Sequence, residues 1–263
     1  ICLISRRNLW IKFNEWMKSV WAPELREDRF QFISSNLNLF IYPDALVEDY
    51  LKLCALDNTW MGLSHAVREK LNSEFQIPEK LRSLRGKLIY FSLGFTGSAA
   101  IELMKRLISI LSKSKHRFII AKGHFLTDYE LPPNICGETF VPQVEILPLV
   151  DLVITHGGNN SLLETRYFAK PLIILPLAFD QHDNAQRVVE KRIGLKFNPF
   201  TVGEHELLQA IDDLLIDSEM LARVKRISKE MHQSESMDRI VDRIEKIAEN
   251  PTLPPLREQF STK

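Results

Sequence analysis

Apolar and polar residues alternate in blocks along most of this chain, and the blocks have the lengths of strands and helices. From about residue 87, short apolar runs predict buried strands at residues 87–93, 117–121 and 135–141. Between the first two runs, residues 99–112 carry apolar side chains at helical spacing and predict an amphipathic helix. Strands separated by helices of this size indicate βαβ units and a parallel sheet.

The second half of the chain continues this pattern. Apolar runs predict a strand that ends at Thr155 and two more at residues 171–176 and 194–197. Helices are predicted after Asp180 to about Lys191, at about 203–216 and 218–231, and over a last segment with Ile240, Val241, Ile244 and Ile247 on one face. We therefore predict an α/β fold with a Rossmann-like parallel sheet flanked by helices.

The first 65 residues differ from the rest because they are rich in aromatic side chains. Residues 9–20 predict a helix that stops near Pro23, and residues 37–41 predict a buried strand. A piece of this size cannot bury so many rings alone, so we expect residues 1–65 to be the remnant of a larger domain. Because the chain does not begin with Met, we also expect a fragment or a processed chain.

The composition predicts where the other domain boundaries fall. Residues 66–86 are charged and are broken by Pro78 and Gly86, so they predict an interdomain linker. We expect residues 87–235 to form the Rossmann-like domain, and residues 236–263 to form a C-terminal helix and tail.

Composition and charge argue against several classes of function. The 263 residues include 34 Lys and Arg against 34 Asp and Glu, so no net charge attracts nucleic acid or an anionic membrane. Cys2, Cys54 and Cys136 are too far apart to indicate a disulfide framework or a zinc site, and they favour a reducing compartment. The longest apolar run, residues 171–179, is shorter than the roughly twenty residues of a membrane span. We expect a cytoplasmic location.

The most informative stretch joins the strand that ends at residue 155 to the next helix. His156 follows a buried strand, where a parallel sheet places its ligands, and its imidazole can donate to a phosphate oxygen. Gly158 permits close backbone approach, and Asn160 and Ser161 present N–H groups to an anion at the helix N-terminus. A tight turn with an Asn cap explains the same residues without a ligand.

Further polar side chains follow close behind. Glu164 lies one helical turn beyond Asn160, where its carboxylate can accept hydrogen bonds from two ribose hydroxyls or merely stabilise the helix dipole. Asp180 and Gln181 leave the next strand and can bind sugar hydroxyls, although an Asp at this place also suits a helix N-cap. A diphosphate anchor beside a carboxylate and an amide suits a nucleotide-sugar.

Phe140 and Gln143 follow the strand predicted at residues 135–141. An aromatic ring at that place can stack on a base, while ordinary core packing of Phe140 is the alternative. The sequence has no Walker lysine, no G-x-G-x-x-G, no H-E-x-x-H and no G-x-S-x-G, so nothing in it indicates an NTPase, a dinucleotide site, a zinc protease or a serine hydrolase.

Taken in order, these residues resemble the donor-sugar signature of the UDP-glycosyltransferase superfamily, the glucosyl- and glucuronosyltransferases. The resemblance covers about fifty residues and consists of Phe140-x-x-Gln143, Leu152-Val153-Ile154-Thr155-His156-Gly157-Gly158-x-Asn160-Ser161-x-x-Glu164, Lys170-Pro171, Pro176, Asp180-Gln181 and Asn184-Ala185-Gln186. A weaker likeness extends from about Tyr42 to about Asn198.

The resemblance implies a GT-B fold, in which two Rossmann-like domains enclose the active site. It implies inverting transfer of a hexose from a UDP-sugar, used as co-substrate, to a small lipophilic acceptor, with no metal or other cofactor. The site residues it implies are Phe140 and Gln143 at the uracil, His156, Gly158, Asn160 and Ser161 at the diphosphate, Glu164 at the ribose, and Asp180 and Gln181 at the hexose.

Two departures from the family pattern qualify this interpretation. Phe95 stands where relatives carry a small hydroxyl residue, which predicts a reshaped or narrower phosphate loop. The family's general base is a His near the start of the N-terminal domain, and no His of residues 1–65 lies where that base is expected, His65 included. We therefore expect the general base in missing N-terminal sequence, and this chain to be inactive by itself.

The alternatives are a non-catalytic UDP-sugar-binding module or pseudoenzyme, a Rossmann-type epimerase or dehydrogenase, and a purely structural partner protein. The missing G-x-G-x-x-G speaks against the second, and the ordered signature speaks against the third. The choice among glucose, glucuronate and N-acetylglucosamine stays open. An endoplasmic reticulum membrane location stays open for a full-length animal-type relative.

Overall fold

The structure is a computed structural model that describes residues 2–25, 30, 32–53, 56–68, 75–123 and 130–250, with only the backbone of residues 2–6 and Thr96. The chain forms two compact units, which we describe separately. Unit 1 comprises residues 1–40, 50–63 and 235–263, and unit 2 comprises residues 41–49 and 64–234.

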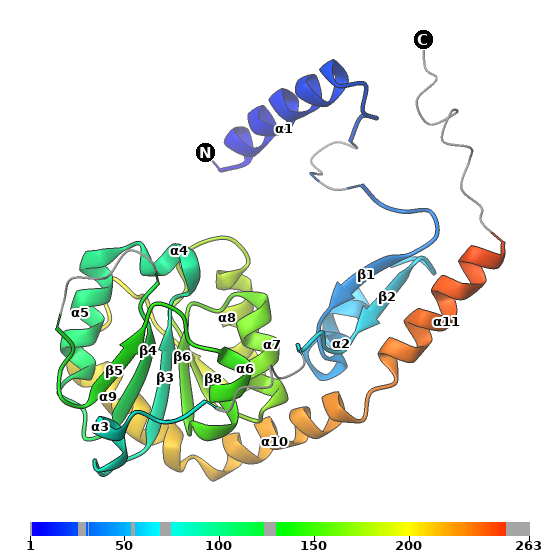
Figure 1. The fold of residues 1–263 in the computed structure, drawn as a ribbon. Coiled ribbons are helices and arrows are strands. Elements are labelled where there is room, and N and C mark those ends of the chain that lie inside the picture. The colour runs from blue at the N-terminus through cyan, green and yellow to red at the C-terminus, as the bar shows by residue number, and fades with distance from the viewer. Residues whose placement is uncertain are drawn as a thin grey trace. The chain divides into compact units, whose positions relative to one another are not determined.

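Unit 2 is built on a six-stranded parallel sheet (Figure 1). Its strands are β3 (Leu88–Ser92), β4 (Arg117–Ala121), β5 (Ile135–Glu138), β6 (Leu152–Thr155), β7 (Leu172–Ile174) and β8 (Gly194–Lys196). The strand order is β5-β4-β3-β6-β7-β8, so the chain moves outward from β3 in one direction and from β6 in the other. This is the order of a Rossmann-type sheet, as the sequence predicts.

Helices cover both faces of this sheet. Those of unit 2 are α3 (Glu79–Arg82), α4 (Gly94–Ser98), α5 (Ile101–Leu111), α6 (Gln143–Ile146), α7 (Asn159–Tyr167), α8 (Gln181–Glu190), α9 (Glu204–Ile216) and α10 (Ser218–His232), with the 3₁₀ helix η1 (Leu147–Leu149). Figure 1 shows α5 and α9 on one side of the sheet and α7 and α8 on the other. The stripe of α5 predicted from the sequence is buried, at Met104, Leu107, Ile108 and Leu111.

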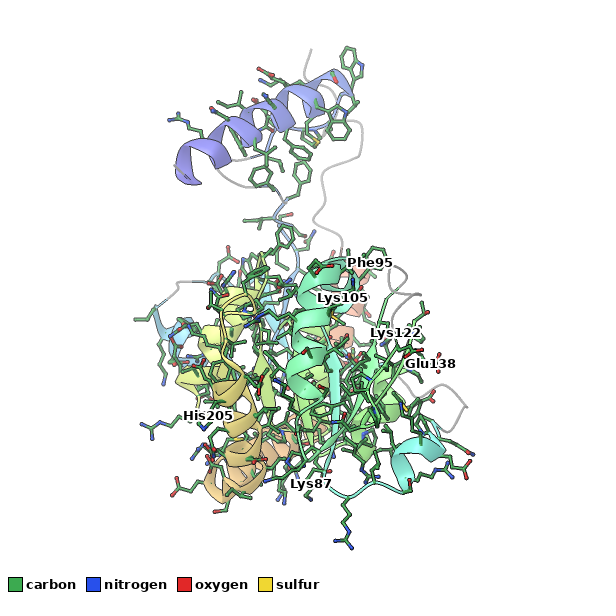
Figure 2. The ribbon with its side chains drawn as sticks, turned by 90° about the vertical axis from the view of Figure 1, so that its left-hand side faces the viewer. Lys87, Phe95, Lys105, Lys122, Glu138 and His205 are labelled. Atoms are coloured by element: carbon green, nitrogen blue, oxygen red, sulfur yellow. The ribbon has the colours of Figure 1, made fainter. Side chains whose placement is uncertain are left out.

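Because the strands are parallel, the sheet has two chemically different ends: one where the strands begin and one where they end. Every residue of β3, β6 and β7 is buried, so polar groups are presented to solvent mainly where the strands begin and end. Lys87, just before β3, and Phe95, just after it, lie at opposite ends of unit 2 (Figure 2). Sites for ligands are expected at the end marked by Phe95, because the strands' carboxyl ends meet there.

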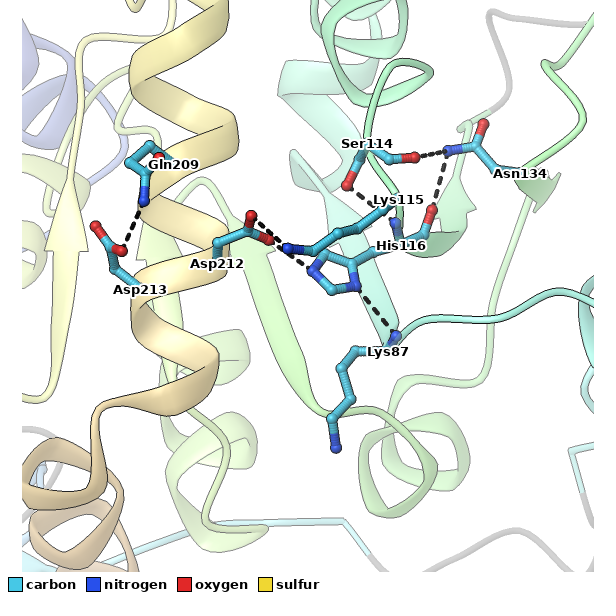
Figure 3. A network of polar contacts seen from close by, with 8 residues as sticks. All are labelled: Lys87, Ser114, Lys115, His116, Asn134, Gln209, Asp212 and Asp213. Carbon is cyan, nitrogen blue, oxygen red and sulfur yellow. Dashed lines mark hydrogen bonds and ion pairs between the residues drawn. The ribbon is translucent and has the colours of Figure 1, made fainter.

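The amino end of the sheet carries a network of polar contacts (Figure 3). The buried His116 accepts a hydrogen bond at Nδ1 from the backbone N–H of Lys87 (3.1 Å), and its Nε2 lies 2.8 Å from Oδ1 of Asp212 on α9. Lys115 Nζ pairs with the other oxygen of Asp212 at 2.7 Å. These contacts tie α9 to the starts of β3 and β4.

Unit 1 contains α1 (Cys2–Ser19), the strands β1 (Asn38–Ile41) and β2 (Trp60–Leu63), and α11 (Ser236–Glu249), while α2 (Asp44–Leu53) crosses from unit 2 into unit 1. The two strands pair with each other, and α11 packs against β2. Ile240 is buried in this unit, whereas Val241 and Ile244 on the same helix stay about half exposed. The amphipathic face predicted for this helix is thus only partly covered.

The sequence predictions hold for every strand of the parallel sheet, with small differences at the ends. The third strand ends at Glu138 and not at residue 141, and residues 94–98, expected as a loop, form the short helix α4. The domain boundaries predicted from the sequence stay predictions. Within the segment predicted as a linker, α3 is helical and its Leu81 is completely buried. Cys54 and the tail from residue 251 lie outside the described residues.

Candidate functional site

The candidate site lies where the two halves of the sheet diverge. β3 and β6 are adjacent parallel strands, yet the helices that follow them, α5 and α7, lie on opposite faces (Figure 1). Their connections therefore separate at the carboxyl edge and leave a crevice, which is the usual ligand position in open α/β sheets. Gly94 lies shortly after the end of β3, and His156 directly follows the end of β6.

A cavity of about 370 Å³ opens at this point, and we call it the switch-point cavity. Five of the residues predicted from the sequence line it, namely Phe140, Gln143, Asn160, Ser161 and Glu164. Arg68, Tyr90, Ser92, Gly94 and Phe95 also line it. Its volume lies within the range of small-molecule sites, roughly 300–1,000 Å³.

His156 stands beside this cavity with its ring between two glycines. A Cβ atom at Gly94 would lie 2.6 Å from Cε1 of the imidazole, and a Cβ atom at Gly158 would lie 2.6 Å from Nε2. Gly94 also has a φ of +68°, which side-chain-bearing residues rarely adopt. The two glycines therefore create the slot that the ring occupies.

The ring of His156 is uncharged near neutral pH. Burial lowers its pKa, although a hydrogen bond with the backbone of Ser92 and the charge of Asp180 act in the opposite direction. The one N–H of the neutral imidazole serves the backbone of Ser92, so the ring gains a donor for an anion when it is protonated, a form that the anion itself favours. The arrangement therefore suits an anionic ligand atom.

Helix α7 begins directly after this slot. Its N-cap is Gly158, which has no side chain to cap the helix, so the interpretation of this turn as an Asn cap is wrong. The first intrahelical bond runs from Leu162 N to Gly158 O at 3.0 Å, and the N–H groups before it have no acceptor within the helix. Asn160 and Ser161 in this first turn line the cavity and present partial positive charge to it.

Glu164 is buried on the cavity-facing side of α7, with only 3% of its surface exposed. It lies beyond the first turn of the helix, which excludes the helix-dipole interpretation. Its Oε1 accepts from Arg68 Nε at 3.2 Å, and its Oε2 accepts from Gln143 Nε2 at 2.5 Å. Ser161 Oγ donates to Gln143 Oε1 at 3.4 Å, so predicted residues from α6 and α7 join in one network.

Several residues of the cavity were not among the sequence predictions, and Tyr90, Ser92 and Arg68 are the most polar of those described below. Tyr90 and Ser92 stand two positions apart in an otherwise apolar strand, so their side chains face the same side of the sheet. This spacing of polar residues could have been used to predict them from the sequence. Burial raises the pKa of Tyr90 to about 12, so its phenol stays a neutral O–H group. Arg68 carries no such signal, because only the path of the folded chain brings it to Glu164.

Asp180 and Gln181 are not among the residues that line the switch-point cavity. Gln181 is buried, and its Oε1 accepts hydrogen bonds from the N–H groups of Leu177 and Ala178 at 2.8 and 3.0 Å. Asp180 occupies the N-cap position of α8, but its carboxylate makes no capping bond and accepts from Asn184 Nδ2 at 3.0 Å. The same Nδ2 donates to Gly157 O at 2.9 Å, which links this loop to the His156 turn.

Phe140 is 68% exposed, so its interpretation as ordinary core is wrong, and its ring is free to stack on a ligand at the rim. Phe95, which is 69% exposed, also lines the cavity. His65 instead packs its ring against Tyr167, with 4.9 Å between centroids. No cluster of three or more metal-binding side chains occurs among the described residues.

Within the same part of the chain, no helix combines the length and the apolar surface needed to cross a bilayer.

Comparison with known proteins agrees with this geometry. Residues 33–257 match the family model of UDP-glucoronosyl and UDP-glucosyl transferase. The chain is 30% identical over 164 residues to an uncharacterized UDP-glucosyltransferase, YdhE, of Bacillus subtilis, covering 61% of this chain and 42% of that protein. It is also 30% identical over 170 residues to the NDP-glycosyltransferase YjiC of the same species, covering 64% of this chain and 43% of that one.

A solved structure, the glycotransferase of kitacinnamycin, superimposes with a TM-score of 0.75 at 21% identity, over 90% of this chain and 61% of that one. This likeness confirms the GT-B type of α/β fold. The chain spans less than half the length of the two curated relatives named above. Since the family model covers most of the residues, the chain belongs to the UDP-glucoronosyl and UDP-glucosyl transferase family.

Proposed function

We propose that the full-length protein is a UDP-glycosyltransferase, and that this chain supplies its donor-binding part. The reaction is the inverting transfer of a hexose from a UDP-sugar to a small lipophilic acceptor. The observation that carries the proposal is the switch-point cavity, which is lined by a buried carboxylate and a helix N-terminus and has His156 behind its lining residue Gly94. These are the groups that a ribose and a diphosphate require.

The diphosphate is proposed to bind at the start of α7. The N–H groups of the first helical turn, including those of Asn160 and Ser161, offer hydrogen bonds that cost no rearrangement. His156, directly after β6, adds a further donor when the diphosphate favours its protonated form, and Gly158 lets the backbone approach the phosphate closely. As the bond to the sugar breaks, charge grows on the UDP leaving group, and these fixed dipoles stabilise it.

The nucleoside is proposed to lie against Glu164 and Phe140. The carboxylate of Glu164 receives one hydrogen bond on each oxygen from Arg68 and Gln143, which fixes its plane and partly offsets the cost of burying its charge. Each oxygen keeps a lone pair for a ribose hydroxyl. Phe140 stacks on the uracil, and Gln143 lies beside that ring.

The hexose is proposed to bind at Asp180 and Gln181, beyond the cavity itself. Gln181 uses its carbonyl oxygen to hold the loop at Leu177 and Ala178, so its contribution to a sugar is through the amide N–H groups. Asn184 ties Asp180 to the turn at Gly157, and thereby sets the carboxylate at a fixed place relative to the diphosphate.

The acceptor hydroxyl is proposed to be deprotonated by a general base that this chain does not supply. No metal is part of the proposed mechanism. The second candidate function is a UDP-sugar-binding module without turnover. Adding an N-terminal acceptor domain in trans separates the two, because only the first gains sugar transfer. The cytoplasmic location expected from the sequence stays a prediction.

Calorimetric titration of the chain with UDP, 2′-deoxy-UDP, UDP-glucose, UDP-glucuronate and NAD tests the donor site. We expect micromolar to millimolar UDP binding, weaker 2′-deoxy-UDP binding and no NAD binding. Glu164→Gln should remove the preference for the ribose hydroxyl, whereas Glu138→Gln, an exposed carboxylate at the end of β5, should not. A folded chain that fails to bind UDP would contradict the proposal.

A further inference from the structure

A second cavity opens at the carboxyl edge of the sheet, between the ends of β7 and β8, and we call it the β7–β8 cavity. Its volume is about 380 Å³, which is again the size of a small-molecule site. It shares no lining residue with the switch-point cavity. The proposed donor site therefore leaves it without a function.

Rings form most of its wall. Pro176 follows β7, and Phe197, Pro199 and Phe200 follow β8, so ring side chains of two connections line one hollow. Phe200 is 61% exposed, which leaves much of its surface available to a ligand. Phe197 and Phe200 favour flat aromatic ligands, because aromatic rings stack on one another.

The wall after β8 is fixed before any ligand arrives. Arg106 on α5 donates to the carbonyl of Pro199 at 2.8 Å and to the carbonyl of Val202. The side chain of Asn198 accepts from the N–H of Phe200 at 2.9 Å, and Phe197 N donates to Ile174 O on β7 at 3.0 Å. A preformed wall of this kind lowers the ordering cost of binding.

The opposite wall is fixed as well. Leu177 belongs to the loop that Gln181 holds through its side-chain oxygen, with 2.8 Å between that oxygen and Leu177 N. The next residue along α8, His182, lies on the cavity side of the loop as one of its lining residues. The wall after β8 is thus anchored to β7 and α5, and the opposite wall is anchored to α8.

The charge of the cavity has one sign. Among the described residues that line it, the ionisable ones are His182 and Lys196, and none is a carboxylate. Lys196 Nζ donates to the side-chain oxygen of Gln186, a neutral group that leaves the ammonium charge uncompensated. An apolar hollow with a basic rim complements a molecule that has an aromatic body and an anionic substituent.

We propose that the β7–β8 cavity binds a planar aromatic anion, an aromatic carboxylate or a phenolate of about two fused rings. The rings stack between Phe200 and the prolines, and the anionic oxygen faces Lys196 and His182. This site does not depend on the donor site, and it can serve either an acceptor or an effector.

Calorimetry with 2-naphthoate, cyclohexanecarboxylate and 2-naphthylmethylammonium tests the proposal on the chain as it stands. We expect submillimolar binding of 2-naphthoate, at least tenfold weaker binding of cyclohexanecarboxylate, and no measurable binding of the ammonium probe. Amide shifts in an NMR titration should fall on residues 194–203 and 176–182. Equal binding of all three probes, or shifts confined to the switch-point cavity, would overturn the proposal.

Variants sharpen the test. Phe200→Ala should weaken 2-naphthoate at least tenfold, and Phe140→Ala, an equally exposed ring in the other cavity, should leave it unchanged. Lys196→Glu should reverse the preference, so that the ammonium probe binds better than 2-naphthoate. Lys196 is exposed, and unchanged UDP binding checks that the variant is folded. An unreversed preference contradicts the assigned charge.

Titration with 2-naphthoate in the presence of saturating UDP or UDP-glucose distinguishes an acceptor site from an effector site. Competition between 2-naphthoate and UDP-glucose, but not UDP, supports an acceptor that reaches the hexose position. Equal 2-naphthoate affinity with and without either nucleotide supports an effector site. Either result is compatible with the site itself, which the probes and variants above decide.

Discussion

Two histidines at opposite ends of one sheet differ in what their ring nitrogens contact. His116, at the amino end, uses Nδ1 for the backbone of Lys87 and Nε2 for Asp212, and it is 6% exposed (Figure 3). His156, at the carboxyl end, is partly buried between two glycines beside a cavity. Its Nδ1 lies 3.4 Å from Thr155 Oγ1, and the ring also hydrogen-bonds with the backbone of Ser92. A histidine that joins a helix to the starts of two strands stabilises the fold, whereas one whose contacts lie next to a cavity can also serve a ligand.

The residues around the two histidines differ in the same way. At the amino end, Lys87, Lys115, Asp151 and Asp212 form ion pairs, so charge is balanced within the protein. At the carboxyl end, the start of α7 presents uncapped N–H groups, and Gly158 offers no side chain to satisfy them. Backbone donors without internal acceptors need solvent or a ligand. The contrast leads to predictions that separate binding from stability.

The largest effect is expected from Gly94→Ala. The added Cβ would lie 2.6 Å from the His156 ring at a backbone φ of +68°, so both the ring and the turn must move. We expect UDP affinity to fall about a hundredfold or more, which corresponds to about 2.7 kcal/mol. Gly203→Ala is the matched control, because its nearest neighbour lies 3.9 Å away and its φ is −75°. Calorimetry compares them, and similar UDP affinities in both variants would refute the slot.

The two histidine variants should differ in what they lose: one loses affinity for UDP, and the other loses stability. His156→Ala should weaken UDP binding roughly 10- to 30-fold, as expected for a lost hydrogen bond to a charged group worth about 1.5–2 kcal/mol, with little change in stability. His116→Ala should leave UDP affinity unchanged and lower the free energy of unfolding by about 2 kcal/mol, since it leaves the Lys87 N–H without its acceptor. Chemical denaturation and UDP titration of both variants measure this. Similar losses of UDP affinity and of stability in both variants would contradict this difference between the two histidines.

Asp212→Asn should have a smaller effect on stability alone. Burial would raise the pKa of Asp212, but hydrogen bonds from Lys115 and His116 outweigh it and hold the pKa below its usual value. A carboxyl with a lowered folded-state pKa stabilises the fold above its unfolded pKa of about 3.9 and loses this contribution as the pH falls through the folded value. We expect a loss of about 1 kcal/mol at pH 7 that shrinks below about pH 4. A difference that is constant from pH 3 to 7 would show that the charge is irrelevant.

The smallest effect is the pH dependence of UDP binding. Burial lowers the pKa of His156, so the ring is neutral at pH 7.5, and a bound diphosphate favours its protonated form. UDP affinity should therefore rise a few-fold as the pH falls toward 5.5, after the change seen in His156→Gln is subtracted to correct for protonation of UDP itself. If the two proteins show the same pH profile, His156 does not contact the diphosphate.

The central strands β3, β6 and β7 could be predicted from the sequence because every residue in them is buried and they appear as mainly apolar runs. The ends of elements could not be predicted so well. β5 stops at Glu138 although the predicted strand continues to Val141, and the short helix α4 forms around Phe95, where the family resemblance implies a phosphate loop. Local propensity is weak at such places, and tertiary contacts decide the backbone.

The site was predictable where its residues follow strands in order, as His156, Glu164 and Gln143 do. Arg68 could not be predicted, because its contact with Glu164 joins residues 96 positions apart through the folded chain. The sequence also suggested that Asn160 and Asp180 cap helices, and the structure contains neither capping bond. Gly158 occupies the N-cap position of α7, and the carboxylate of Asp180 accepts a hydrogen bond from Asn184 instead. Residue type alone does not distinguish a capping group from a ligand-binding one.

The most direct test of the central claim is an NMR titration of the ¹⁵N-labelled chain with UDP. We predict that amide shifts concentrate at Gly94, at residues 157–161 and around Gln143 and Glu164, while the amides of Lys87, His116 and Asp212 stay unchanged. Shifts centred on the amino end of the sheet, or none at saturating UDP in a folded chain, would contradict the account.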